Sequence, residues 1–229
     1  MKKGLVEVVM VVDRSGSMCN MMEEAIGSCN AVIKDHQTDK AKDTRFTLAL
    51  FDHEYDLIHN GVRMRYADYL NSETCYARGS TSLLDAVGRT INMVGTRLCV
   101  TPEQNRPEQV LFVIMTDGYE NSSKEFTYHQ VQDMINHQED RYNWNFLFLG
   151  SNIDAKKAGT SIGIQGVCTY NFAQSVGGFR SVSSAINYVS SGLSCGASYK
   201  NLCCSLDNSN LENSNAIKKG SSSSDSLSS

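Results

Sequence analysis

Three short polar side chains follow the first apolar run of the chain. Residues 8–12 are all apolar, and Asp13, Ser15 and Ser17 come after them at alternate positions. Such an apolar run predicts a strand that is buried on both faces. Side chains at alternate positions of an extended or turning loop point the same way, so one carboxylate and two hydroxyls converge there. Small oxygen ligands of this kind favour Mg²⁺, which binds oxygen in an octahedron.

The pattern Asp-x-Ser-Gly-Ser at residues 13–17 resembles the metal-ion-dependent adhesion site of von Willebrand factor A (vWA) domains. That family carries two further pieces downstream, in a fixed order. Residues 78–86 look like its threonine loop, with Thr81 just before a predicted helix. Residues 110–118 look like its second buried strand, which ends at Asp117. The resemblance implies a single metal site formed by Asp13, Ser15, Ser17, Thr81 and Asp117.

The resemblance also implies a role for each of these residues. The hydroxyls of Ser15 and Ser17 would ligate Mg²⁺ directly, with Mn²⁺ as the alternative ion, and Thr81 would ligate it directly or through water. Asp13 and Asp117 would act mostly through waters. An ion with few direct carboxylate ligands is electron-poor and takes a carboxylate from outside. The expected partner is therefore a protein ligand that presents an acidic side chain.

Each loop taken alone has a simpler explanation. Ser15 and Ser17 would also suit the cap of a helix that begins near Met18. Asp117 followed by Gly118 is also common in ordinary turns. The order of the three pieces, on the expected strand and helix ends, favours the metal site over these separate explanations.

Three polar residues lie near the predicted site without belonging to the ligand set. Asp85 lies one helical turn after Thr81, where it either supports the threonine loop or is a solvated charge on the helix face. Glu120 and Asn121 follow the predicted turn at Asp117, and we expect them in a surface loop at the rim of the site.

A closer resemblance, to stand-alone bacterial and prophage vWA proteins of a single domain, covers about residues 4–190. It rests on residues 79–86, 116–126 and 144–154. The function of that group is largely undefined, so this resemblance narrows the fold more than the biology. The Ser- and Asn-rich end of the chain is not part of the shared pattern.

Composition limits the classes of function. The chain has 229 residues, 41% of them hydrophobic, and a net charge of -4. Its basic residues are scattered, which argues against a nucleic-acid surface. The first apolar run is short and contains Glu7, so we expect neither a signal peptide nor a membrane span. Without an export signal, the eight cysteines are expected to be free thiols of a cytoplasmic protein.

Strands and helices alternate along the sequence, which predicts an α/β fold with a doubly wound, mostly parallel sheet. We expect a vWA domain at 1–191 and a Ser/Asn-rich disordered tail at 192–229. An Asn-Gly turn at 60–61 should precede the second half of an antiparallel edge strand. The expected strands are 4–13, 45–51, 56–64, 109–116, 145–149 and 166–172. The expected helices are 18–36, 82–98, 127–139, 154–159 and 178–190.

Several motifs that resemble catalytic or binding sites are rejected because the surrounding residues do not fit them. Residues 159–163 match Gly-x-Ser-x-Gly, but a short helix precedes the serine and every histidine lies upstream, so a serine-hydrolase triad is rejected. A phosphatase of the haloacid dehalogenase type needs a second aspartate two residues after Asp13, where Ser15 stands. No nucleotide-binding glycine motif occurs, and the cysteines near the end of the chain have no companion histidines for zinc.

The sequence therefore predicts an intracellular, non-enzymatic, Mg²⁺-dependent protein-binding module, with no role for nucleic acid or membrane. No oligomeric state follows from it. One alternative is a metal-dependent phosphoester hydrolase that uses the same ion as a Lewis acid. Another is an accessory subunit of a separately encoded AAA ATPase.

Overall fold

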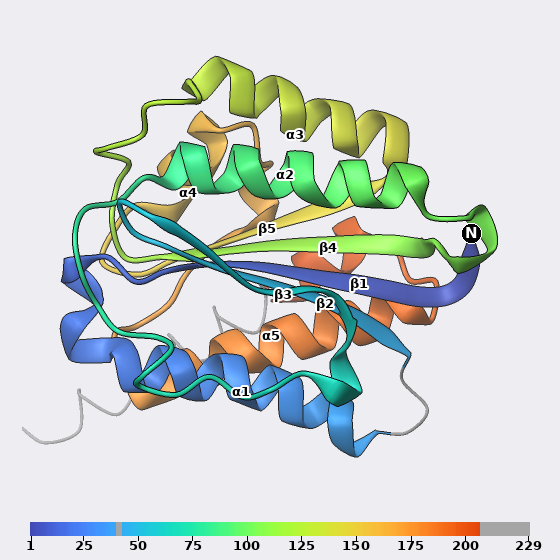
Figure 1. Ribbon diagram of the computed structural model, residues 1–229, viewed down its shortest axis with the longest axis horizontal. Helices are drawn as coiled ribbons and strands as arrows, with labels where there is room; N and C mark the ends of the chain where they lie inside the picture. The colour runs from blue at the N-terminus through green and yellow to red at the C-terminus, as the bar shows by residue number, and fades with distance from the viewer. Residues whose placement is uncertain (40–42, 207–229) are drawn as a thin grey trace, which may run out of the picture.

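The protein is built around a six-stranded sheet, seen edge-on in Figure 1. The computed structural model describes residues 1–39 and 43–206. The strands are β1 (Lys2–Asp13), β2 (Thr44–Phe51), β3 (Tyr55–Arg63), β4 (Pro107–Thr116), β5 (Trp144–Gly150) and β6 (Thr169–Asn171). Their order in the sheet is β3-β2-β1-β4-β5-β6. All neighbours are parallel except β2 and β3, which are antiparallel.

Helices cover both faces of this sheet. The α-helices are α1 (Met22–Thr38), α2 (Leu83–Val100), α3 (Tyr128–Tyr142), α4 (Ala155–Ser161) and α5 (Val176–Ser194). Single 3₁₀ turns are Gly16–Met21, Met64–Tyr66, Glu103–Asn105 and Gly166–Cys168. Figure 1 shows α2 and α3 on one side and α1 and α5 on the other. This confirms the predicted doubly wound α/β fold with one antiparallel edge strand.

The sheet carries the core because its central strands are covered on both faces. Every residue of β1 from Leu5 to Asp13 is buried, which is why this strand reads as a continuous apolar run. Glu7, a buried acid in the middle of the run, is paired with Arg97 of α2 and accepts a hydrogen bond from Thr47 of β2 at 2.8 Å. The strand therefore ends at a fixed position, directly before the polar loop that begins at Arg14.

The predicted Asn60-Gly61 turn is wrong. Both residues lie inside β3, where the pairing with β2 shifts register. Gly61 has a φ of +62°, a conformation that glycine adopts without strain and that such bulges use. The chain reverses instead at residues 52–54, where the Glu54 amide donates to Asp52 Oδ1 at 2.6 Å.

The expected disordered tail is also corrected at its start. Helix α5 continues to Ser194, and residues 199–206 form a further helical segment. Leu202 and Cys203 are buried, and the Tyr199 hydroxyl donates to the Phe146 carbonyl of β5 at 2.5 Å. The apolar residues of this segment are few, so their packing was not visible in a Ser- and Asn-rich sequence. The rest of the expected tail, 207–229, lies outside the described residues.

Two general features bear on the environment of the protein. All eight cysteines are free thiols. In the part of the chain that the structure describes, no helix combines the length and the apolar character needed to cross a bilayer.

The packing of residues 199–206 predicts a measurable loss of stability for Leu202→Ala. The Leu202 side chain lies tightly against α5, since a Cβ added at Gly192 would come within 2.5 Å of it. Removing it should lower the free energy of unfolding by about 2–5 kcal/mol. Cys204→Ala, at an exposed neighbour, is the control. Urea unfolding checks both, and equal stabilities would show that this segment does not belong to the core.

Candidate metal centre

The predicted site lies where the strand order reverses, at the carboxyl ends of β1 and β4. These strands are direct neighbours, with Val12 opposite Met115. Asp13 ends β1 and Asp117 directly follows β4, so their backbones emerge side by side. Ligands of open α/β sheets bind in the crevice at this kind of reversal. Thr81 reaches the same edge because it lies two residues before the first turn of α2.

The side chains of three loops lie close together, two of them joined by a hydrogen bond. Ser17 Oγ donates to Asp117 Oδ1 at 2.6 Å and lies 3.1 Å from Ser15 Oγ. Thr81 faces the same space, because a Cβ added at Gly118 would lie 3.2 Å from Thr81 Oγ1 and 3.8 Å from Ser17 Oγ. The absence of a side chain at Gly118 therefore leaves room between two of the hydroxyls.

The Asp13 carboxylate is bonded to its own loop and to the end of β4. Its Oδ1 accepts a hydrogen bond from the Ser15 amide at 2.7 Å, and its Oδ2 accepts one from Thr116 Oγ1 at 2.6 Å. Ser15 makes no helix-capping hydrogen bond at the start of the 3₁₀ turn Gly16–Met21. The capping explanation for Ser15 thus has no support, and the structure brings all five predicted residues to one place.

Both carboxylates are buried, and neither has a basic partner in the part of the chain that the structure describes. Asp13 is 0% exposed and Asp117 is 4% exposed. Burial raises the pKa of Asp13 to about 6, against the hydrogen bonds from Thr116 and Ser15 that lower it. Burial also raises the pKa of Asp117, which the hydrogen bond from Ser17 opposes. Burial makes the negative charge on both side chains costly, and a cation bound beside them would offset that cost.

The donor set fits a hard divalent cation. It consists of three hydroxyls and two carboxylates, and oxygen ligands of this type suit Mg²⁺ and Mn²⁺. Among residues 1–39 and 43–206, no group of three or more His, Cys, Asp or Glu residues is placed to hold a metal ion. The oxygen-lined site at β1 and β4 is therefore the candidate metal centre.

Solved structures share this architecture at low sequence identity. Proximal thread matrix protein 1 from the mussel byssus is 14% identical, with a TM-score of 0.55 over 89% of this chain and 47% of that one. A von Willebrand factor type A protein from Catenulispora acidiphila is 17% identical, with a TM-score of 0.54 over 83% of this chain and 43% of that one. The chain has the von Willebrand factor A fold. It spans about half the length of these two proteins.

The vWA domain of the type V pili tip protein Mfa5 from Porphyromonas gingivalis matches over most of its own length. It is 11% identical, with a TM-score of 0.53 over 80% of this chain and 95% of that one. Another structure of the mussel protein, with a TM-score of 0.54 and 15% identity, has zinc in its metal-ion-dependent adhesion motif. No protein-family model matches this sequence, and no curated protein is similar to it.

Glu120 and Asn121 lie in a loop at the surface, as expected, and they also join the loop after Asp117 to the threonine loop of the vWA fold. The Thr81 amide donates to Asn121 Oδ1 at 2.9 Å, and the Asn121 amide donates to the Thr81 carbonyl at 3.0 Å. Glu120 Oε2 accepts a hydrogen bond from the Leu84 amide in the first turn of α2 at 2.9 Å. An acidic side chain suits a helix N-terminus, but the helix that Glu120 binds begins far earlier in the chain, with Leu84 36 residues before Glu120. The sequence alone therefore does not pair them.

Asp85 supports the same loop rather than facing solvent. Its carboxylate accepts hydrogen bonds from the backbone amides of Lys124, Glu125 and Phe126, at 2.8 to 2.9 Å. The side chain is buried, so these three bonds satisfy a charge that water does not reach. Asp85 therefore holds the segment that follows Asp117 against the start of α2.

The rejected serine-hydrolase motif occupies an ordinary helix end. Ser161 is the last residue of α4, and its hydroxyl donates to the Ala158 carbonyl one turn earlier at 2.7 Å. A serine committed to its own helix is not presented at the end of a strand as a nucleophile would be.

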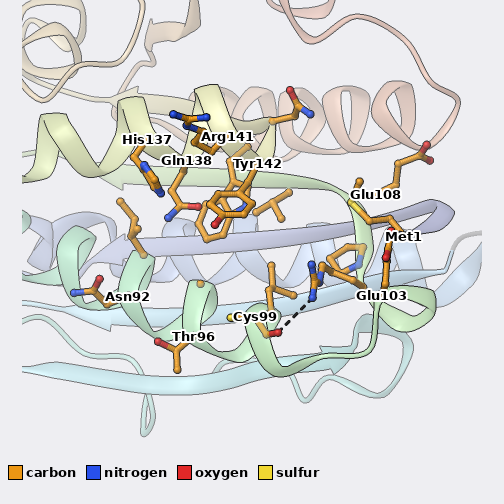
Figure 2. Close-up of a pocket in the computed structure, with 18 residues that line it drawn as sticks. Met1, Asn92, Thr96, Cys99, Glu103, Glu108, His137, Gln138, Arg141 and Tyr142 are labelled. Carbon is orange, nitrogen blue, oxygen red and sulfur yellow. Dashed lines mark hydrogen bonds and ion pairs between the residues drawn. The ribbon is translucent and has the colours of Figure 1, made fainter.

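A separate cavity of about 440 Å³ lies between α2 and α3, near the amino ends of β4 and β5. Figure 2 shows His137, Gln138 and Tyr142 reaching into it from α3, with Thr96 and Cys99 opposite on α2. None of the five predicted site residues lines it. It lies at the opposite end of the strands from the candidate metal centre.

The three amide bonds to Asp85 predict that Asp85→Asn destabilises the fold. An asparagine has one acceptor oxygen, and its NH₂ group would face backbone donors, so the free energy of unfolding should fall by about 2–3 kcal/mol. Asp133→Asn is the control, because Asp133 lies on the exposed face of α3. Denaturant unfolding measures both. A loss no larger than that of the control would contradict the supporting role of Asp85.

Proposed function

We propose that this vWA domain binds Mg²⁺ through Asp13, Ser15, Ser17, Thr81 and Asp117, and that the ion binds an acidic side chain of a protein partner. The observation that carries the proposal is the 2.6 Å hydrogen bond between Ser17 Oγ and Asp117 Oδ1. It joins two loops that are 100 residues apart in sequence at the strand reversal. Asp117 and the nearby Asp13 are both buried, and neither pairs with a basic side chain among the described residues.

The roles of the residues follow from their present contacts. The hydroxyls of Ser15, Ser17 and Thr81 would face the ion directly. Asp13 already accepts two hydrogen bonds that hold its own loop, so its role would be to orient the loop and to balance charge. Ser17 is exposed while Asp13 is buried, so the outer side of the ion would be open. Once bound, the ion supplies a positive charge that accepts a partner carboxylate.

The arrangement supports binding more than catalysis. A nucleophilic attack by Asp13 would have to give up its hydrogen bonds to Ser15 and Thr116. No second carboxylate stands two residues later to protonate a leaving group, since Ser15 fills that position. We therefore propose a non-enzymatic interaction module. Its eight free thiols support a reducing, intracellular setting.

The test is capture of the partner with and without metal. The full chain is immobilised and incubated with an extract of the cells that produce it, in Mg²⁺ and in EDTA. We expect a protein that is retained only with Mg²⁺, and that is lost with Asp117→Ala and with Ser15→Ala. Asp133→Ala, which removes an exposed carboxylate on α3, should retain it.

Two outcomes of this experiment would contradict the proposal. Retention that is indifferent to EDTA and to both site variants would assign recognition to another surface. Turnover of a phosphoester substrate by the same preparation, abolished by EDTA and by Asp117→Ala, would favour the hydrolase instead.

A further inference from the structure

A buried carboxylate outside the candidate ligand set lies between the two loops that carry the hydroxyls. Asp52 is at the turn between β2 and β3 and is 0% exposed. Its Oδ2 accepts hydrogen bonds from Arg14 Nε and from Arg78 Nε, each at 2.8 Å. Arg14 lies between Asp13 and Ser15 in sequence, and Arg78 lies three residues before Thr81. One oxygen atom therefore joins both loops.

The backbone repeats this connection. The Arg78 amide donates to the Arg14 carbonyl at 2.9 Å, and the Gly16 amide donates to the Gly79 carbonyl at 3.0 Å. The Ser82 amide donates to the Asp52 carbonyl at 2.9 Å. The two loops are thus bonded to each other and to the β2–β3 turn, although none of these atoms belongs to a candidate ligand.

The buried charges of Asp52 and Arg14 depend on each other. Arg14 is 1% exposed, so its guanidinium is buried and costly to leave unpaired. Burial alone would raise the pKa of Asp52, but hydrogen bonds from Arg78, the Glu54 amide and Arg14 hold it below the usual value. The Tyr76 ring lies beside both guanidiniums: its centroid is 5.9 Å from Arg14 Cζ and 5.4 Å from Arg78 Cζ.

We propose that Asp52, Arg14 and Arg78 form a clasp that positions the metal site. The clasp sets the distance between the Ser15–Ser17 loop and the Thr81 loop before the ion binds. Metal ligands on loose loops must be ordered at the moment of binding, which costs affinity, whereas ligands held in advance do not. This inference rests on the proposed metal site, and it assigns positioning residues that do not touch the ion.

A second buried ion pair provides a stringent control. Glu7 is 0% exposed, like Asp52, and is paired with Arg97 of α2. The Arg97 side chain is 25% exposed and that of Arg78 is 29% exposed. Glu7 lies in the first half of β1, far along the strand from Asp13. Arg97→Ala removes the arginine that pairs with Glu7, whereas Arg78→Ala leaves Asp52 still bonded to Arg14. Arg97→Ala is therefore the harsher change to a buried carboxylate, but only Arg78→Ala affects the site.

The experiment measures two properties of the full chain for the wild type, Arg78→Ala, Arg78→Lys and Arg97→Ala. The first is amide hydrogen exchange in EDTA, followed in peptides that cover residues 13–18 and 78–82. The second is the Mn²⁺ affinity measured by calorimetry. We expect Arg78→Ala to speed exchange in both loops and to weaken Mn²⁺ binding about tenfold. Arg78→Lys, which keeps the charge, should recover part of both effects.

Arg97→Ala should lower the unfolding temperature by at least as much as Arg78→Ala does, yet leave loop exchange and Mn²⁺ affinity within about twofold of the wild type. Equal losses of Mn²⁺ affinity in the two alanine variants would overturn the clasp, because general destabilisation would then explain both. Unchanged loop exchange in Arg78→Ala would overturn it as well. A wild type that binds no Mn²⁺ would overturn the proposed metal site, and with it the clasp as a metal-positioning device, even if loop exchange responds as expected.

Discussion

The parallel pairing of β1 with β4 is the constraint on which the rest of the structure depends. It places the ends of two fully buried strands next to each other, so the residues that follow them meet at one edge of the sheet. Polar groups that would be costly in the core are tolerated at this edge because they contact one another. Ser17 and Asp117 meet only because Val12 and Met115 are opposite each other in the sheet. A slip in register would separate them.

Burial of polar groups at this edge requires a second layer of contacts. Asn121, Asp85 and Asp52 each bind backbone or guanidinium groups of a loop that carries a candidate ligand. Asn121 belongs to the β4–α3 loop, Asp85 to α2 and Asp52 to the β2–β3 turn, so the site is supported from three elements. The loops that carry the candidate ligands are thus held from outside the site. In this account the fold supplies rigidity and the loops supply chemistry.

The sequence predicts those features that are local, and it misses those that depend on distant partners. Residues 8–12 and 110–116 mark buried strands on their own, and each ends at the acid that the site uses. Asn121 and Asp52 are unremarkable in sequence because their partners lie about 40 and 26 to 38 residues away. The Asn-Gly pair at 60–61 fits both a turn and a bulge, and only pairing with β2 decides between them. Leu202 was missed because a short helix gains its stability from α5 and not from its own sequence.

We propose that a divalent cation binds where the three loops meet, with a position open to a partner carboxylate. Anomalous diffraction from crystals soaked in Mn²⁺ tests it most directly. We expect one strong peak at bonding distance from the hydroxyls of Ser15 and Ser17, with Thr81 and Asp117 next to it and water on the outer side. A peak elsewhere, no peak at this edge of the sheet, or an ion fully enclosed by side chains of this chain would contradict the account.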